Sequence, residues 1–116
     1  MMIRSLLEEF LQIEGVTAAA LIASDGFLID SAGSVPVDGD ALAALAPCAM
    51  NFFSRAGASL ERGGARQFVL EHEYGSIIVI QVSGDELLAI ITGSHSSPGQ
   101  LAYILPRITH RVAAVI

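Results

Sequence analysis

Hydrophobic residues recur along the chain with two different periods, and the changes from one period to the other delimit eight predicted elements. Helical spacing occurs over about residues 3–13, 40–57 and 98–116, where apolar side chains return every three or four positions. Strand-like runs bounded by turn residues occupy 16–24, 27–31, 66–71, 75–82 and 86–92. The predicted order is therefore α-β-β-α-β-β-β-α.

Short polar turns between the strands indicate consecutive antiparallel pairing. Asp25-Gly26 separates the first two strands, and Asp-Gly between two strand-like runs is a strong hairpin signal. The first strand is apolar on both faces and rich in alanine, which is typical of an interior strand covered by helices. We predict an α+β fold in which a five-stranded antiparallel sheet is flanked by three helices, with residues 1–116 forming a single domain.

The ends of the outer helices are marked by residues that stop or start a helix. Gly15 follows the first helix as its stop, and Ser97 is the predicted N-cap of the last helix, with Pro98 at its first position. Pro47 and Pro106 fall inside predicted helices, where a proline removes one backbone hydrogen bond. We therefore expect kinks at these two prolines, or helices that begin later than the periodicity indicates.

The second helix, capped by Asp38 or Asp40, has apolar residues around most of its circumference. One stripe contains Leu42, Leu45, Ala49, Phe52 and Ala56, and a second, about 100° further round, contains Ala43, Ala46, Met50 and Phe53. Together they cover roughly 220°, whereas a surface helix usually has an apolar arc nearer 100°. One stripe suffices to cover a sheet, so the other needs a different partner.

That partner is either a neighbouring segment of the same chain or a second chain. An exposed patch around Met50 and Phe53 would cover a few hundred Å², which monomeric proteins tend to avoid. Burying one Met or Phe contributes about 1.5–3 kcal/mol, and a symmetric homodimer is the commonest way to bury such a patch. The pattern therefore favours a homodimer formed through this helix.

Composition and charge exclude several classes of protein. The chain has a net charge of −6, and its six basic residues, all arginine, are dispersed along it, so a nucleic-acid partner is not expected. No apolar run is long enough for a membrane span, and Glu8 and Glu9 interrupt any signal peptide, so we expect a cytoplasmic protein without membrane insertion. The single cysteine, Cys48, has apolar neighbours and is expected to be a buried thiol.

Residues for catalysis or metal binding are not grouped in the sequence. The three histidines lie in three different predicted elements: His72, His95 and His110. Ser94, His95 and Asp85 do not match a nucleophilic triad because no nucleophile elbow surrounds the serine. The loop 93–99 lacks the phosphate-binding glycine-lysine pattern and is better explained as a helix cap. We therefore predict neither an enzyme nor a bound cofactor or metal.

Several short motifs in order resemble the roadblock (dynein light chain) superfamily, including its bacterial and archaeal members. They are Leu6-Leu7-x-x-Phe10-Leu11, Glu14-Gly15-Val16, Ala19-Ala20-Leu21-Ile22 and Ser24-Asp25-Gly26-Phe27-Leu28-Ile29, followed by the alanine-rich helix and three strands. The resemblance covers nearly the whole chain. It implies a sheet with the first and last helices on one face and the second helix on the other.

The same resemblance implies partners. Roadblock proteins dimerise through the second helix and the strand after it, forming a ten-stranded sheet, and they bind Ras-like small GTPases without catalysis of their own. Carried onto this chain, the candidate dimer interface is Leu42, Ala43, Leu45, Ala46, Ala49, Met50, Phe53, Arg66, Phe68 and Leu70. Whether such a protein stimulates GTP hydrolysis or acts only as a scaffold is left open, and a small-molecule sensor of the PAS or GAF type is an alternative that requires a pocket of several hundred Å³.

Charged substitutions at Met50 and Phe53 test the prediction that the second stripe lies in a dimer interface. Monomers or aggregates are expected by light scattering, because the charges would oppose burial at the interface. An unchanged mass would mean that this stripe faces the core of its own chain.

Overall fold

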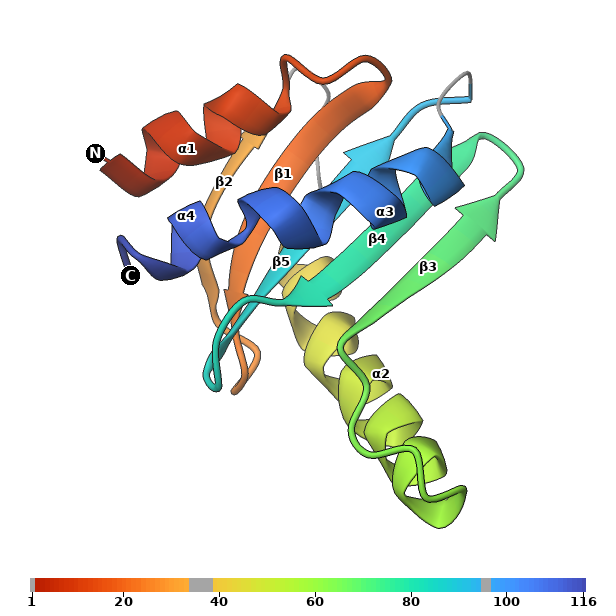
Figure 1. The fold of residues 1–116 in the computed structure, drawn as a ribbon. Coiled ribbons are helices and arrows are strands. Elements are labelled where there is room, and N and C mark those ends of the chain that lie inside the picture. Colours follow the sequence, from red (N-terminus) through yellow and green to blue (C-terminus); the bar gives the residue numbers. More distant parts are fainter. Residues whose placement is uncertain (1, 34–38, 95–96) are drawn as a thin grey trace.

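The computed structural model describes residues 2–33, 39–94 and 97–116 (Figure 1). Its elements are α1 (Met2–Phe10), β1 (Val16–Ala23), β2 (Leu28–Gly33), α2 (Gly39–Ser59), β3 (Gln67–His72), β4 (Gly75–Gln81), β5 (Glu86–Thr92), α3 (Pro98–Ile108) and α4 (His110–Ala113). The predicted order of helices and strands is confirmed. The last helix is divided in two at Thr109.

The five strands form one antiparallel sheet in the order β2-β1-β5-β4-β3. Figure 1 shows α1, α3 and α4 on one face of this sheet and α2 on the other, so the predicted α+β sandwich is confirmed. Ala18, Ala19 and Ala20 of β1 are at most 1% exposed, as expected for an interior strand covered on both faces. Their small side chains allow the helices to approach the sheet closely.

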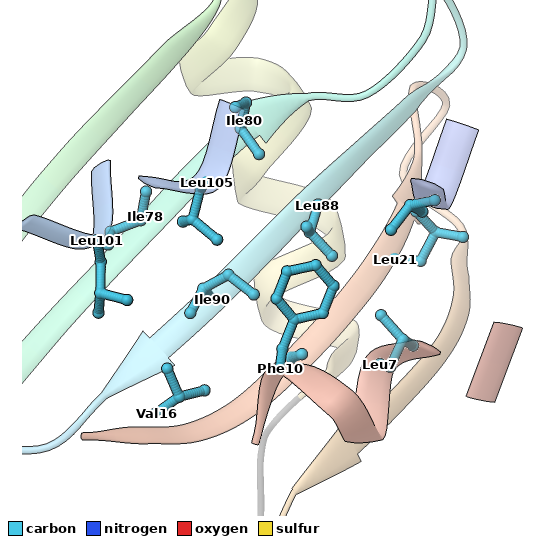
Figure 2. Packing of buried hydrophobic residues seen from close by; sticks show 12 residues of the cluster. Leu7, Phe10, Val16, Leu21, Ile78, Ile80, Leu88, Ile90, Leu101 and Leu105 are labelled. Atoms are coloured by element: carbon cyan, nitrogen blue, oxygen red, sulfur yellow. The ribbon is translucent and has the colours of Figure 1, made fainter. Parts of the chain in front are cut away.

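The larger core layer lies between the sheet and the helices α1, α3 and α4 (Figure 2). Leu7 and Phe10 of α1 and Leu101 and Leu105 of α3 are each no more than 5% exposed. They pack on strand residues that point to the same face: Val16, Ala19, Leu21, Ile78, Ile80, Leu88 and Ile90. The apolar spacing of the two outer helices therefore serves this one layer.

The Asp25-Gly26 turn forms the predicted hairpin between β1 and β2. Gly26 has a positive φ of 94°, which favours glycine, and the Asp25 carboxylate accepts the N–H of Phe27 at 3.2 Å. The N–H of Ala23 donates to the carbonyl of Phe27 at 2.8 Å and closes the turn. The hairpin signal in the sequence is thus correct.

The predicted helix ends are only partly correct. Ser97 occupies the N-cap of α3 with Pro98 in the first turn, yet the Ser97 side chain makes no capping hydrogen bond. Asp40 lies inside the first turn of α2, so it does not cap this helix, and Asp38 lies outside the described residues. After Phe10, Gly15 ends a run of tight turns and not the helix itself, and its φ is 90°.

The two helix prolines have different consequences. α2 continues through Pro47 as one helix of 21 residues, and α3 also begins before its proline, so the expectation of late helix starts is wrong. Pro106 lacks the N–H that would donate to the carbonyl of Ala102 one turn earlier. Gln67 of β3 supplies this donor through Nε2 at 3.3 Å, and the helix breaks three residues later at Thr109. A side chain of β3 therefore supplies the donor that Pro106 lacks.

A double-mutant cycle tests this replacement. Gln67→Ala should lower the free energy of unfolding by about 0.5–1.5 kcal/mol, the usual net value of one hydrogen bond. In a Pro106→Ala background the cost should be smaller, because the restored N–H can donate to Ala102. Urea unfolding of the four proteins gives the coupling, and equal costs in both backgrounds would contradict the role assigned to Gln67.

Candidate protein-interaction site

The face of α2 that lies on the sheet is the one predicted to be free. Ala43, Ala46 and Met50 are 1%, 3% and 5% exposed and pack against β1, β4 and β5. The predicted exposure of Met50 is therefore wrong. Three small or flexible residues fit closely against alanine-rich strands, whereas the leucine-phenylalanine stripe is too bulky for this position. Three members of the stripe predicted to be free therefore face the sheet, while its fourth member, Phe53, is exposed as predicted.

The stripe turned away from the sheet is apolar and open to solvent. Leu45 and Phe52 are each 68% exposed, and Phe53 is 37% exposed. Ala56 is exposed on the same side of the helix, one turn after Phe52. We call Leu45, Phe52, Phe53 and Ala56 the α2 stripe. Leu45 and Phe52 are largely uncovered by the described residues, and such patches on monomers are unusual.

The second half of α2 extends past the sheet, as Figure 1 shows. The segment after it folds back along the helix: Arg62 donates its N–H to the carbonyl of Gly57 at 2.7 Å, and Ala65 donates to Ser54 Oγ at 2.9 Å. A side chain at Gly57 would meet the carbonyl oxygen of Gly63 at 2.2 Å, so this close return requires glycine. The projecting end of α2 is therefore held in a defined conformation by the segment that folds back along it.

Phe53 connects the α2 stripe to β3. Its ring meets Phe68 of β3 edge to face, with 5.2 Å between centroids, and meets Phe52 at 5.9 Å. Such aromatic pairs add about 0.5–1.5 kcal/mol beyond burial. The helix stripe and the strand edge thus form one continuous surface, and these are the two parts that the resemblance to roadblock proteins implies for the interface.

β3 is an outer strand with one unpaired edge. Among the described residues β3 pairs only with β4, in unshifted register from Gln67 opposite Ile80 to His72 opposite Gly75. Val69 and Leu70 in the middle of the strand are 37% and 40% exposed. A regular apolar strand with a free edge can pair with another strand through its backbone.

Part of the sheet on the α2 side lies outside the reach of α2. Leu70, Ile77 and Ile91 form a row across β3, β4 and β5, and none of the three is fully buried. A surface hollow of about 370 Å³ lies here, lined by Ile77, Ile91 and the β3–β4 turn with Tyr74. We call Leu70, Ile77 and Ile91 the open row. Sequence periodicity could not separate this row from the rest of the core face.

Opposite charges lie at the two parts of this site. Three of the six arginines, Arg55, Arg62 and Arg66, are exposed at the projecting end of α2 and in the segment after it. Glu71 and Glu73 are exposed beside the open row. The two ion pairs seen among the described residues, Arg4–Asp30 and Arg111–Glu9, involve neither group. These charges are therefore available to a partner.

The remaining candidate interface residues lie close to this surface. Leu42 and Ala49 of α2 are half-buried, as is Phe68 of β3, while Arg66 is exposed. The candidate set omitted Phe52, the most exposed aromatic residue of α2. It stood in the stripe assigned to the sheet, and helical spacing alone cannot say which of two apolar stripes faces inward.

Residues singled out for chemistry do not converge in the part of the chain that the structure describes. His72 and His110 are exposed on different elements, and His95 lies outside the described residues. Ser94 and Asp85 lie near opposite ends of β5, and Ser94 Oγ donates to the carbonyl of Tyr74 at 3.3 Å. Among the described residues, no group of three His, Cys, Asp or Glu side chains could hold a metal.

Cys48 is exposed, so the prediction of a buried thiol is wrong. On α2 it lies on the opposite side from Ala46 and Met50, beside Pro47. A second surface hollow of about 440 Å³ is lined there by Ser24, Pro47, Cys48, Met50, Asn51, Ser54, Gln81, Gly84 and Leu87. Several of these residues are exposed, whereas Met50 and Leu87 belong to the core on the α2 side, so this hollow is open to solvent at the margin of that core layer.

Comparison with known proteins agrees with this architecture. The model of the Roadblock/LC7 domain matches residues 2–92. Two proteins of Methanocaldococcus jannaschii, MJ1340 and MJ0310, are each 25% identical over 114 residues, which cover 98% of this chain and 99% of the relative.

Within the described part of the chain, no helix is both long and apolar enough to cross a membrane.

Solved structures share the fold over nearly its full extent. Myxococcus xanthus MglB has a TM-score of 0.87 at 16% identity, covering 99% of this chain and 94% of that protein. A Roadblock/LC7 domain from Streptomyces avermitilis has a TM-score of 0.84 at 25% identity, with coverage of 96% and 94%. Acanthamoeba castellanii profilin IA is similar at 0.69 and 15% identity, covering 96% of each chain.

Truncations on the two faces of α2 should have different effects on folding. Met50→Ala should lower the free energy of unfolding by about 2–5 kcal/mol, because it leaves a cavity against the sheet. Leu45→Ala, on the exposed stripe, should change the stability of the folded chain by no more than about 0.5 kcal/mol. Urea unfolding at low protein concentration measures both, and a large cost for Leu45→Ala under these conditions would show that the stripe packs within its own chain.

Proposed function

The chain belongs to the Roadblock/LC7 domain family, and from this membership we propose that it is a homodimeric, non-catalytic protein of the cytoplasm that binds a Ras-like small GTPase as its regulator or scaffold. The observation that carries the proposal is the exposed α2 stripe beside the unpaired edge of β3. The class of the partner comes from the resemblance to roadblock proteins. The absence of a catalytic role is part of the same proposal.

Surfaces that one chain leaves uncovered support the proposed dimer. A twofold axis beside β3 would pair the two β3 edges antiparallel and extend the sheet to ten strands. The same rotation would carry the projecting half of one α2 toward the open row of the other chain. Each buried Leu or Phe side chain then contributes about 1.5–3 kcal/mol, so Leu45 and Phe52 from both chains give a substantial driving force.

Charge complementarity supports this arrangement. Arg55 and Arg62 would travel with the projecting helix end, and Glu71 and Glu73 flank the open row that receives it. Charges at the rim of an interface mainly speed association and fix its orientation. They would therefore favour the twofold arrangement over a random apolar contact.

A dimer of this kind would offer a GTPase a broad rigid surface. The joined sheets would carry α1, α3 and α4 of both chains on one face and the two α2 helices on the other. Binding of a GTPase in one nucleotide state stabilises that state, because a ligand shifts an equilibrium by its difference in affinity. A protein without catalytic residues can regulate a GTPase in this way.

The first experiment is a pull-down from native lysate with the tagged protein, once with a GTP analogue and once with GDP. The matched variant Leu45→Glu/Phe52→Glu should sediment as a monomer where the unaltered protein is a dimer, because the charges oppose burial of the stripe. Asp85→Asn, on the remote β4–β5 turn, serves as the surface control and should leave the mass unchanged.

Mass spectrometry identifies what is retained. A Ras-like GTPase held more strongly in one nucleotide state supports the regulator, and equal retention in both states supports a scaffold. If no GTPase is recovered and a small molecule is retained instead, the proposal fails in favour of a sensor. A monomeric unaltered protein would refute the dimer independently of the GTPase result.

A further inference from the structure

The two outer edges of the sheet are built differently. β3 is regular along its whole pairing with β4. In β2 the register shifts, because Leu21 pairs with Asp30 and Ile22 with Leu28, so Ile29 is an extra residue. A bulge of this kind twists an edge strand and weakens it as a template for further pairing.

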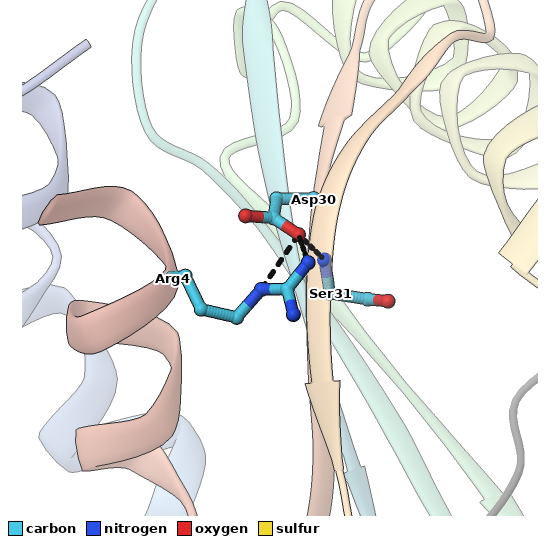
Figure 3. A network of polar contacts seen from close by, with 3 residues as sticks. All are labelled: Arg4, Asp30 and Ser31. Carbon is cyan, nitrogen blue, oxygen red and sulfur yellow. Dashed lines mark hydrogen bonds and ion pairs between the residues drawn. The ribbon is translucent and has the colours of Figure 1, made fainter. Parts of the chain in front are cut away.

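An ion pair lies on the same edge strand, as Figure 3 shows. Arg4 of α1 reaches β2, where its Nε lies 2.9 Å from Asp30 Oδ1 and its Nη2 contacts the same oxygen. This oxygen also accepts the N–H of Ser31 at 2.8 Å. The hydrogen bond from Arg4 holds the pKa of Asp30 below its ordinary value, so the carboxylate is charged at neutral pH.

We propose that Arg4, Asp30 and the Ile29 bulge close the β2 edge to pairing with a second copy of this chain. We call these three residues the edge guard. A strand adding to β2 would have to displace the guanidinium from Asp30 or strip water from the pair, and both are unfavourable. Asp30 is the one charged residue of β2, whose other side chains are apolar or small.

The consequence of such a guard concerns assembly. A dimer joined at β3 still has two β2 edges, one at each end of its ten-stranded sheet. If β2 could pair with β2 of another dimer, the sheets would join end to end without closing, and such contacts produce filaments. The guard therefore limits growth to one edge. The limit on filament growth rests on the proposed dimer, whereas the closure of the β2 edge does not depend on it.

The chain contains a matched control. Arg111 of α4 contacts Glu9 of α1 through Nη2, at 3.2 Å from Oε1 and 3.0 Å from Oε2. This pair also ties α1 to the rest of the fold, and its side chains are 54% and 55% exposed. It joins two helices and touches no strand edge. Its removal reports the effect of loosening α1 alone.

The test compares Arg4→Ala/Asp30→Val with Glu9→Ala/Arg111→Ala by sedimentation velocity over a range of protein concentrations, with circular dichroism to confirm folding. The first variant should form larger species reversibly, with at least about a doubling of the mean mass relative to the unaltered protein. The control variant should keep the unaltered mass. Adding Ser31→Lys to the first variant should restore that mass, because a lysine on an edge strand opposes pairing.

Equal masses for the folded Arg4→Ala/Asp30→Val variant and the unaltered protein would overturn the proposal, as would equal growth of the control. If this variant does not fold, the milder exchange Arg4→Gln/Asp30→Asn decides: larger species support the guard, and the unaltered mass refutes it. The mass of the unaltered protein decides separately whether the proposed dimer exists. Failure of the guard is therefore distinguishable from failure of the dimer.

Discussion

The length of α2 relative to the sheet is the constraint on which the rest of the structure depends. The helix has 21 residues, so it is about 31 Å long. Ala43, Ala46 and Met50 are buried against the sheet, Phe52 is exposed to solvent, and the end of the helix projects past the sheet. A helix of this length leaves apolar surface uncovered at its own end and on the sheet beyond its reach. The projecting helix end carries the exposed residues Arg55 and Arg62, and the open row lies beside the exposed residues Glu71 and Glu73.

Alanine in the interior strand β1 allows this arrangement. Ala18, Ala19 and Ala20 of β1 are buried on both faces, so helices on each side can lie close to the backbone. The large side chains of the core come from α1, α3 and the flanking strands, and they gather on one face. On the α2 face, four of the eight buried residues are alanines: Ala20, Ala43, Ala46 and Ala89. On this side of the sheet Ile77 and Ile91 remain half-buried.

The two outer strands of the sheet differ in whether they can pair with a further strand. At β2 a bulge and the Arg4–Asp30 pair oppose further pairing, and at β3 a regular strand with exposed Val69 and Leu70 permits it. Phe53 and Phe68 join this open edge to α2. Among the described residues, the side chains considered for catalysis or metal binding do not converge. The surface is therefore suited to recognition between proteins, which agrees with membership of the Roadblock/LC7 domain family.

The sequence by itself determined the order of elements, the Asp25-Gly26 hairpin, the interior position of β1 and the excess of apolar surface on α2, because each depends on local spacing or on residue type. Only the tertiary structure decided which stripe of α2 faces the sheet. Helical periodicity separates faces without orienting them, and packing against small strand residues selected Met50 and left Leu45 and Phe52 outside. The exposure of Cys48, the donor from Gln67 to Ala102 and the pairing of Arg4 with Asp30 likewise depend on residues far apart in the chain. Contacts of that kind are set by how elements pack and cannot be read from a local pattern.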